Sequence, residues 1–183
     1  MSREADREAL RDLLRARSVR TGDFVLASGA RSSYYIDARL TTMSGRGQLL
    51  IGRLGLAELD AHGWQPATVG GLTLGADPVA YAIAHAAAAA GRPLEAFTVR
   101  KEAKSHGTGR VIEGNLGDGM DVVVVEDVIT SGESALRAAT AVAAAGARVL
   151  GILAVVDRDE GGRSRIEAAG YEAASLFSAA DLQ

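Results

Sequence analysis

The chain has 183 residues, of which 48% are hydrophobic and 23% charged, a composition that suits one globular domain with a sizeable core. Its formal net charge of −3, from 20 basic and 23 acidic side chains, argues against a protein built as a whole for nucleic acid or anionic membranes. Cysteine is absent, which excludes disulfides and thiolate metal sites and is compatible with the cytoplasmic location that we expect.

The first 18 residues are charged from the third position onward and predict a helix with Leu10, Leu13 and Leu14 on one face. This segment lacks the apolar core of a signal peptide, so we do not expect export by that route. The longest apolar runs of the chain are interrupted well before ~18 positions, and we therefore expect no membrane span.

Alternating strand and helix patterns follow this helix. Short extended segments are expected first, at residues 23–26 and 33–37. The main body then predicts helix, strand, helix and strand in turn, at residues 47–62, 67–70, 76–90 and 94–99.

Residues 101–119 show no sustained periodicity. They contain five glycines and charges of both signs, and we predict a long loop without regular structure. Loops of this length inside a compact domain are often functional.

The alternation resumes with an apolar strand at residues 120–125. Helix, strand, helix and strand are then expected at residues 133–145, 148–156, 163–169 and 171–177. Such a series predicts an α/β fold with a central parallel sheet flanked by helices and joined by right-handed crossovers. Ligands of these sheets bind beyond the carboxyl ends of the strands, and residues 126–134 fall at one of these ends.

The turn Thr130-Ser131-Gly132 has the composition of a phosphate-binding loop. Consecutive backbone N–H groups at the start of a helix form a concavity with partial positive charge, and a 5′-phosphate fits there. Hydroxyl groups of Thr130, Ser131 and Ser134 add donors, while glycine permits close approach. The alternative is a plain helix N-cap after a solvated strand end. The ordered coincidence of four valines, two acids, this turn and a helix favours a ligand site.

Two acids, Glu126 and Asp127, precede this turn. Carboxylates in contact with a phosphate would repel it, so we assign them to the 2′- and 3′-hydroxyls of a ribose. They can also hold Mg²⁺ through water, and we predict no direct protein ligand set for the metal.

Residues 122–134, VVVVEDVITSGES, resemble the phosphoribosyl diphosphate signature of the type I phosphoribosyltransferases. Three further segments, FVLASGARSSYYIDARL (24–40), VRKEAKSHGTG (99–109) and VVDRDEGG (155–162), resemble the orotate phosphoribosyltransferase family. The resemblance runs along nearly the whole chain. It implies the type I fold as one domain over residues 1–183, with a hood at about 1–40 plus part of the C-terminus and a flexible catalytic loop at about 101–119.

The resemblance also implies a reaction: Mg²⁺-dependent transfer of the 5-phosphoribosyl group from its 1-diphosphate to orotate, giving orotidine 5′-monophosphate and diphosphate in UMP synthesis. The expected assembly is a homodimer whose catalytic loop closes over the neighbouring subunit's site. The expected partners are these small molecules, without nucleic acid or membrane.

Roles for individual residues follow from the resemblance. Lys104, His106 and Asp127 are the expected catalytic residues. Orotate is expected to contact Thr130 and Arg158, because a guanidinium matches a carboxylate with two hydrogen bonds; Tyr34 and Tyr35 are either further contacts or packing in the hood. Phosphoribosyl diphosphate is expected to contact the cations of the loop and the signature: Arg100, Lys101, Lys104, His106, Glu126, Asp127, Val128, Ile129, Thr130, Ser131, Gly132, Glu133 and Ser134.

The chain departs from the family pattern at three places. Ala27 stands where some members carry a lysine, and that cation is missing here. Thr73 and Leu74 stand where some members carry a tyrosine-lysine pair, and backbone amides of residues 71–75 can substitute for it. Glu133 stands where glycine is frequent, and an acid at a helix start is tolerable when it points outward.

Two alternatives stay open. One is a phosphoribosyltransferase for another base, such as a purine or uracil, from which the hood segment and Arg158 distinguish the leading hypothesis. The other is a non-catalytic regulator that senses phosphoribosyl diphosphate, which would not need Lys104 or His106.

Overall fold

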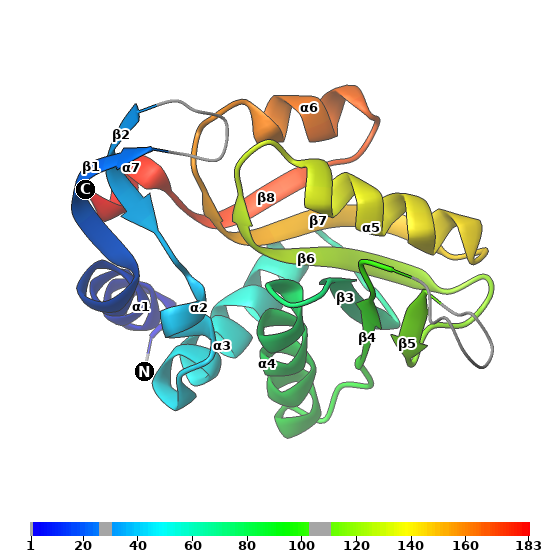
Figure 1. Cartoon of the computed structure of the whole chain (residues 1–183). Coiled ribbons are helices and arrows are strands. Elements are labelled where there is room, and N and C mark those ends of the chain that lie inside the picture. The colour runs from blue at the N-terminus through cyan, green and yellow to red at the C-terminus, as the bar shows by residue number, and fades with distance from the viewer. Residues whose placement is uncertain (1, 26–30, 103–110) are drawn as a thin grey trace.

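The computed structural model describes residues 2–25, 31–102 and 111–183 (Figure 1). The helices in these ranges are α1 (Arg3–Ser18), α2 (Arg39–Thr42), α3 (Gly45–Ala61), α4 (Ala76–Ala89), α5 (Glu133–Ala144), α6 (Gly162–Ala168) and α7 (Ala179–Leu182). The strands are β1 (Val19–Val25), β2 (Arg31–Ile36), β3 (Thr68–Leu72), β4 (Glu95–Val99), β5 (Ile112–Gly114), β6 (Asp121–Ile129), β7 (Arg148–Asp157) and β8 (Ala173–Ser178).

Six strands form the central sheet in the order β5-β4-β3-β6-β7-β8. All neighbouring pairs are parallel except β4 with β5, which is antiparallel. The predicted parallel sheet flanked by helices is therefore confirmed.

The prediction that residues 101–119 lack regular structure is wrong at β5. Three residues are too few to produce a period in the sequence, and this strand exists because it pairs with the edge of β4. The backbone N–H of Arg100 also donates to the carbonyl of Val111 at 2.8 Å.

A separate hydrophobic core covers each face of the sheet. Val123 and Val125 of β6 belong to the core shared with α1, α3 and α4, whereas Val122 and Val124 belong to the core shared with α5. Figure 1 shows α3 and α4 on one side of the sheet and α5 and α6 on the other. Burial on both faces explains why β6 reads as a continuous apolar run instead of an alternating one.

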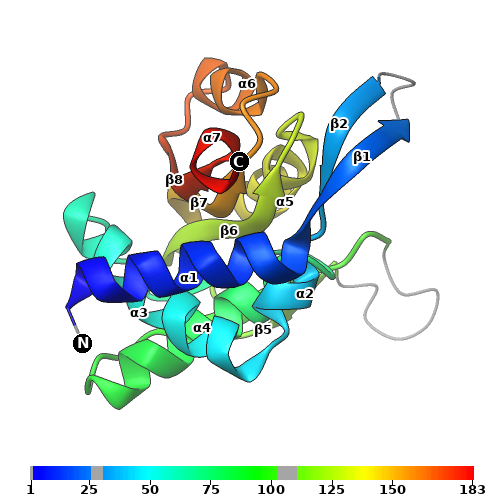
Figure 2. The same cartoon turned by 90° about the vertical axis from the view of Figure 1, so that its left-hand side faces the viewer.

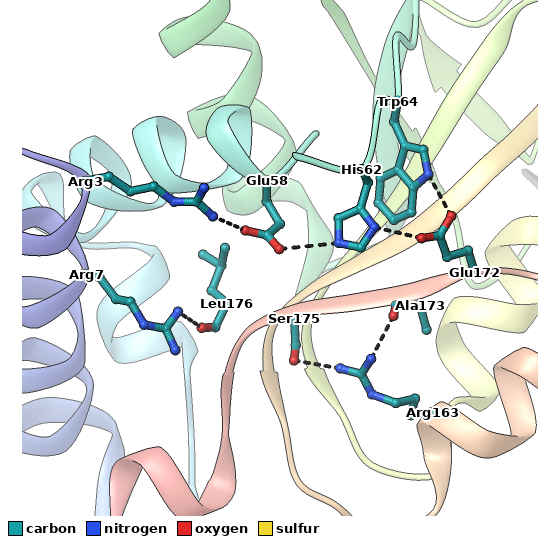
Figure 3. Close-up of polar contacts among 10 residues, drawn as sticks. All are labelled: Arg3, Arg7, Glu58, His62, Trp64, Arg163, Glu172, Ala173, Ser175 and Leu176. Carbon is teal, nitrogen blue, oxygen red and sulfur yellow. Dashed lines mark hydrogen bonds and ion pairs between the residues drawn. The ribbon is translucent and has the colours of Figure 1, made fainter. Parts of the chain in front are cut away.

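The N-terminal elements form a smaller unit beside the sheet. Strands β1 and β2 pair antiparallel, and Figure 2 shows this pair projecting away from the central sheet while α1 runs along α3. Polar contacts attach α1 to the body (Figure 3): Arg3 pairs with Glu58 of α3 at 2.6 Å, and Arg7 donates to the carbonyl of Leu176 in β8. The predicted hood at about residues 1–40 remains a proposal that these contacts support.

Two short helices, α2 and α7, were not predicted because four residues are too few for a helical period. α7 owes its start to a capping box, in which Ser178 and Asp181 bond each other's backbone N–H. It contacts α1, which brings the C-terminus to the N-terminal unit.

The strand order indicates where a ligand site lies. The chain runs from β3 to β4 on one side and then returns to β6 on the other side of β3, so the strand order reverses between β3 and β6. The carboxyl ends of strands at such a switch point leave a crevice that binds ligands.

Candidate active site

The turn at residues 130–132 lies between β6 and α5, as predicted. Gly132 precedes α5 with φ of 74°, a left-handed conformation that glycine adopts without steric cost. Residues around this turn line a narrow polar hollow at the N-terminus of α5, where backbone N–H groups attract an anion. They are Glu126, Val128, Ile129, Thr130, Ser131, Gly132, Glu133, Ser134 and Ala135.

The predicted end of the strand at Val125 is wrong, because β6 continues to Ile129. Pairing with β7 extends it, with Glu126 opposite Ala154 and Ile129 opposite Asp157. Glu126 and Asp127 therefore belong to the strand, and their side chains point to opposite faces.

Gly162, the first residue of α6, lets the backbone at the start of this helix pack against the turn at residues 130–132. A Cβ atom on Gly162 would lie 2.2 Å from the carbonyl oxygen of Thr130, and a Cβ atom on Gly132 would lie 2.8 Å from the carbonyl oxygen of Gly162. The two backbones thus pack directly on each other. Sequence reasoning gave Gly162 no role, although the Gly-Gly pair after a predicted strand was a signal for close backbone approach.

Glu126 is almost completely buried, with 5% of its surface exposed. Burial, and next the negative charge of neighbouring Asp127, raise the pKa of its carboxyl to about 9, while the positive charge of Lys101 acts in the opposite direction. Its Oε2 atom has no hydrogen-bond partner among the residues that the structure describes. A neutral carboxyl with an unused oxygen can bond a sugar hydroxyl, as predicted for this residue.

The loop from β3 to α4 lies against Asp127 of β6. A Cβ atom on Gly75 would lie 2.5 Å from Asp127 Oδ1, so this loop packs against the carboxylate. Asp77 fixes the loop by accepting hydrogen bonds from Thr73 Oγ1 at 2.7 Å and Thr98 Oγ1 at 2.9 Å. Sequence reasoning missed Asp77, since a carboxylate in the first turn of a helix is common without a site.

Arg158 directly follows β7, and its side chain is only 5% exposed. Its backbone N–H donates to the carbonyl of Ile129 at 2.9 Å, which ties it to the end of β6. The guanidinium carbon lies 5.2 Å from the ring centroid of Tyr34, within range of a cation–π interaction. Tyr35, on the other face of β2, packs instead against Phe24 with centroids 5.7 Å apart. Of the two tyrosines, Tyr34 thus lies beside the predicted base contact.

The predicted cations follow β4. Arg100 is half-buried and Lys101 is exposed, and the carbonyl of Lys101 accepts a hydrogen bond from Arg137 of α5. Lys104, His106 and Ala27 lie outside the described residues, and the roles of the first two stay predictions. Lys101 is close enough to act electrostatically on Glu126, which brings the start of this loop to the site.

Within the described ranges, no group of three or more His, Asp or Glu side chains has the arrangement of a metal site.

The fold and the site are together typical of α/β proteins that bind a phosphorylated sugar at the switch point of the sheet. The family model described as the phosphoribosyl transferase domain matches residues 49–169. The chain belongs to this family, and the matched segment runs from within α3 through α6, which includes every strand of the central sheet except β8.

Full-length relatives carry a more specific name. An orotate phosphoribosyltransferase of Mycobacterium avium is 50% identical over 179 residues, covering 98% of this chain and 97% of the relative. The crystal structure of Mycobacterium tuberculosis orotate phosphoribosyltransferase with Fe(III) dicitrate is 48% identical, with a TM-score of 0.86 over 97% of this chain and 98% of that one. The same enzyme with 5-phospho-alpha-D-ribosyl 1-diphosphate has a TM-score of 0.81 at 42% identity, over 98% of this chain and 92% of that one.

Among the residues that the structure describes, no helix is both long and apolar enough to cross a membrane.

Proposed function

We propose that this protein is an orotate phosphoribosyltransferase, which moves the 5-phosphoribosyl group from 5-phospho-α-D-ribose 1-diphosphate to orotate and releases diphosphate. The observation that carries the choice of base is Arg158, a buried guanidinium beside the phosphate-binding turn. Its Nε and Nη2 atoms make no hydrogen bond within the described part of the chain, although Nη2 lies 2.8 Å from Oε1 of Glu160. Such donors suit the carboxylate that orotate has and that uracil and the purines lack.

The turn at residues 130–132 positions the sugar by binding its 5′-phosphate. Backbone N–H groups at residues 130–132 and the start of α5 bind the 5′-phosphate, and the hydroxyls of Thr130, Ser131 and Ser134 add donors. Glu133 and Ser131 are exposed, which agrees with an acid that points outward from the turn. The carboxyl groups of Glu126 and Asp127 then bond the ribose hydroxyls and hold C1 near the base.

Positive charge helps diphosphate to leave. Arg100 and Lys101 lie at the carboxyl end of β4, and Lys104 and His106 follow in the same loop sequence. Cations that meet the developing negative charge lower the barrier for its departure. Lys104 or His106 also donates a proton to the leaving group. The backbone of the β3–α4 loop takes the place of the lysine that position 74 lacks.

Mg²⁺ is the proposed cofactor. It neutralises charge on the diphosphate when bound. The carboxyl oxygens of Glu126 and Asp127 would hold the metal through water, while oxygen atoms of the diphosphate would bind it directly.

A homodimer is the proposed assembly, with loop 101–119 of one subunit completing the site of the other. Large apolar side chains are exposed on the neighbouring helices α2, α3 and α4 and at Met43, directly after α2, which supports an association surface here. They are Leu40 (41% exposed), Met43 (49%), Leu49 (54%) and Tyr81 (51%). The absence of cysteine agrees with the reducing cytoplasm as its location.

The test mixes the protein with phosphoribosyl diphosphate and Mg²⁺ and follows the ultraviolet absorbance of orotate, with hypoxanthine, adenine and uracil as competing bases. We expect loss of orotate absorbance that none of the other bases suppresses. Turnover of another base but not orotate would establish the rival transferase. Tight binding of phosphoribosyl diphosphate without any turnover would establish the regulator.

A further inference from the structure

Arg158 already has a carboxylate partner within its own loop. Its Nη2 atom lies 2.8 Å from Oε1 of Glu160, whose side chain is 38% exposed. Burying a guanidinium without a counter-charge is costly, so Glu160 stabilises the empty site.

This ion pair is close but poorly directed. Although Nη2 and Oε1 are within contact distance, neither Nη2 nor Nε of Arg158 makes a hydrogen bond within the described ranges. Carboxylates bind arginine best through two parallel N–H···O bonds, and Glu160 does not provide them. An incoming carboxylate that takes the place of Glu160 and accepts hydrogen bonds from both Nη2 and Nε would bind Arg158 better than Glu160 does.

Glu160 can leave without breaking the elements around it. It lies in the short connection between β7 and α6, after Asp159 with φ of 58° and before Gly161 with φ of 86°. Arg158 is held independently, through its backbone N–H to Ile129 and its ring contact with Tyr34. The anchored arginine can thus exchange one carboxylate for another.

We propose that Glu160 is an internal substitute for the carboxylate of the base: it pairs with Arg158 in the free enzyme, and the carboxylate of the incoming base displaces it. This inference rests on the proposed function, because it takes a carboxylated base as the ligand of Arg158. Glu160 thereby lowers the affinity for that base and keeps the buried arginine neutralised when the site is empty or holds a base without a carboxylate.

The test is the Glu160→Gln variant, which keeps the shape of the side chain and removes the competing charge. Partly exposed ion pairs are weak, so the KM for orotate should fall only about two- to fivefold. The KM for phosphoribosyl diphosphate should stay the same, because that ligand does not use Arg158. Titration calorimetry with orotate should show a Kd lowered by a similar factor.

The matched control is Glu167→Gln, the same change at an exposed position of α6, and it should leave both KM values unchanged. Glu160→Asp adds a second check, because it retains the charge but is one methylene too short to keep the contact, and it should also lower the KM for orotate. If Glu160→Gln leaves the KM for orotate unchanged or raises it, Glu160 does not compete with the base. If the unmodified protein neither binds nor consumes orotate, the proposed function itself fails.

Discussion

Glu126 and Asp127 are adjacent acids with different surroundings. Glu126 is buried in the sheet and its pKa is raised to about 9, whereas Asp127 is half-buried, accepts a hydrogen bond from the N–H of Val128 at 2.9 Å and meets the β3–α4 loop. Two acids that are adjacent in the sequence therefore present two chemically different carboxyl groups to the proposed ribose site. The neutral carboxyl can donate as well as accept a hydrogen bond.

This difference predicts how stability depends on pH. Between the ordinary pKa of 4.5 and about 9, the folded protein holds a proton on Glu126 that the unfolded chain has released. Its contribution to stability is thus full below pH 4.5 and is lost as the pH rises towards 9, by at most about 1.4 kcal/mol per pH unit.

The Glu126→Gln variant cannot ionise and escapes this loss. Its free energy of unfolding, relative to the unmodified protein, should increase steadily from pH 5 to pH 8 in urea titrations without ligand. Glu167→Gln controls for the change of side chain. Parallel stability curves for Glu126→Gln and the unmodified protein would show that Glu126 is ionised in the fold.

At the scale of elements, the features that could be predicted from the sequence are those that hydrophobic periodicity and local side-chain chemistry determine. The position of the turn at residues 130–132 was predictable, because its hydroxyl residues, Gly132 and the following helix all favour the same local backbone geometry. The extension of β6 over Glu126 and Asp127 was not, because pairing with β7 overrides the low strand preference of acids. Strand β5 and the contact of Gly162 with Thr130 likewise depend on segments distant in the sequence.

The support of the turn by α6 predicts an effect of Gly132→Ala. Alanine would be strained at φ of 74°, and its Cβ atom would press on the carbonyl of Gly162, so the turn must shift. We expect a loss of about 1–3 kcal/mol in stability and a fall of at least about tenfold in kcat/KM for phosphoribosyl diphosphate.

Gly91→Ala is the matched control, because Gly91 also has positive φ, 71°, but a Cβ atom there would meet nothing within 4 Å and the residue lies outside the proposed site. It should lose stability through backbone strain while it keeps normal kcat/KM. Equal kinetic effects of the two variants would mean that contact with α6 does not shape the phosphate site.

At the scale of the whole molecule, the sites of the proposed dimer should depend on both subunits. Lys104→Ala removes a loop cation, and Asp127→Asn removes a carboxylate from the strand, so each pure variant should be nearly inactive. A mixed dimer should recover one complete site, about half the activity of the unmodified dimer, because one subunit supplies the loop and the other the strand. Mixed dimers no more active than their parents would show that each loop serves its own subunit.

The most direct test of the proposed function is the stoichiometry of the phosphoribosyl transfer. With orotate, phosphoribosyl diphosphate and Mg²⁺, the protein should form one orotidine 5′-monophosphate and one diphosphate for each orotate consumed, measured by chromatography with mass detection. Because the proposed reaction only exchanges groups at C1 of the ribose, the purified nucleotide and diphosphate should also return orotate. Release of diphosphate with free ribose 5-phosphate and unchanged orotate would contradict the account.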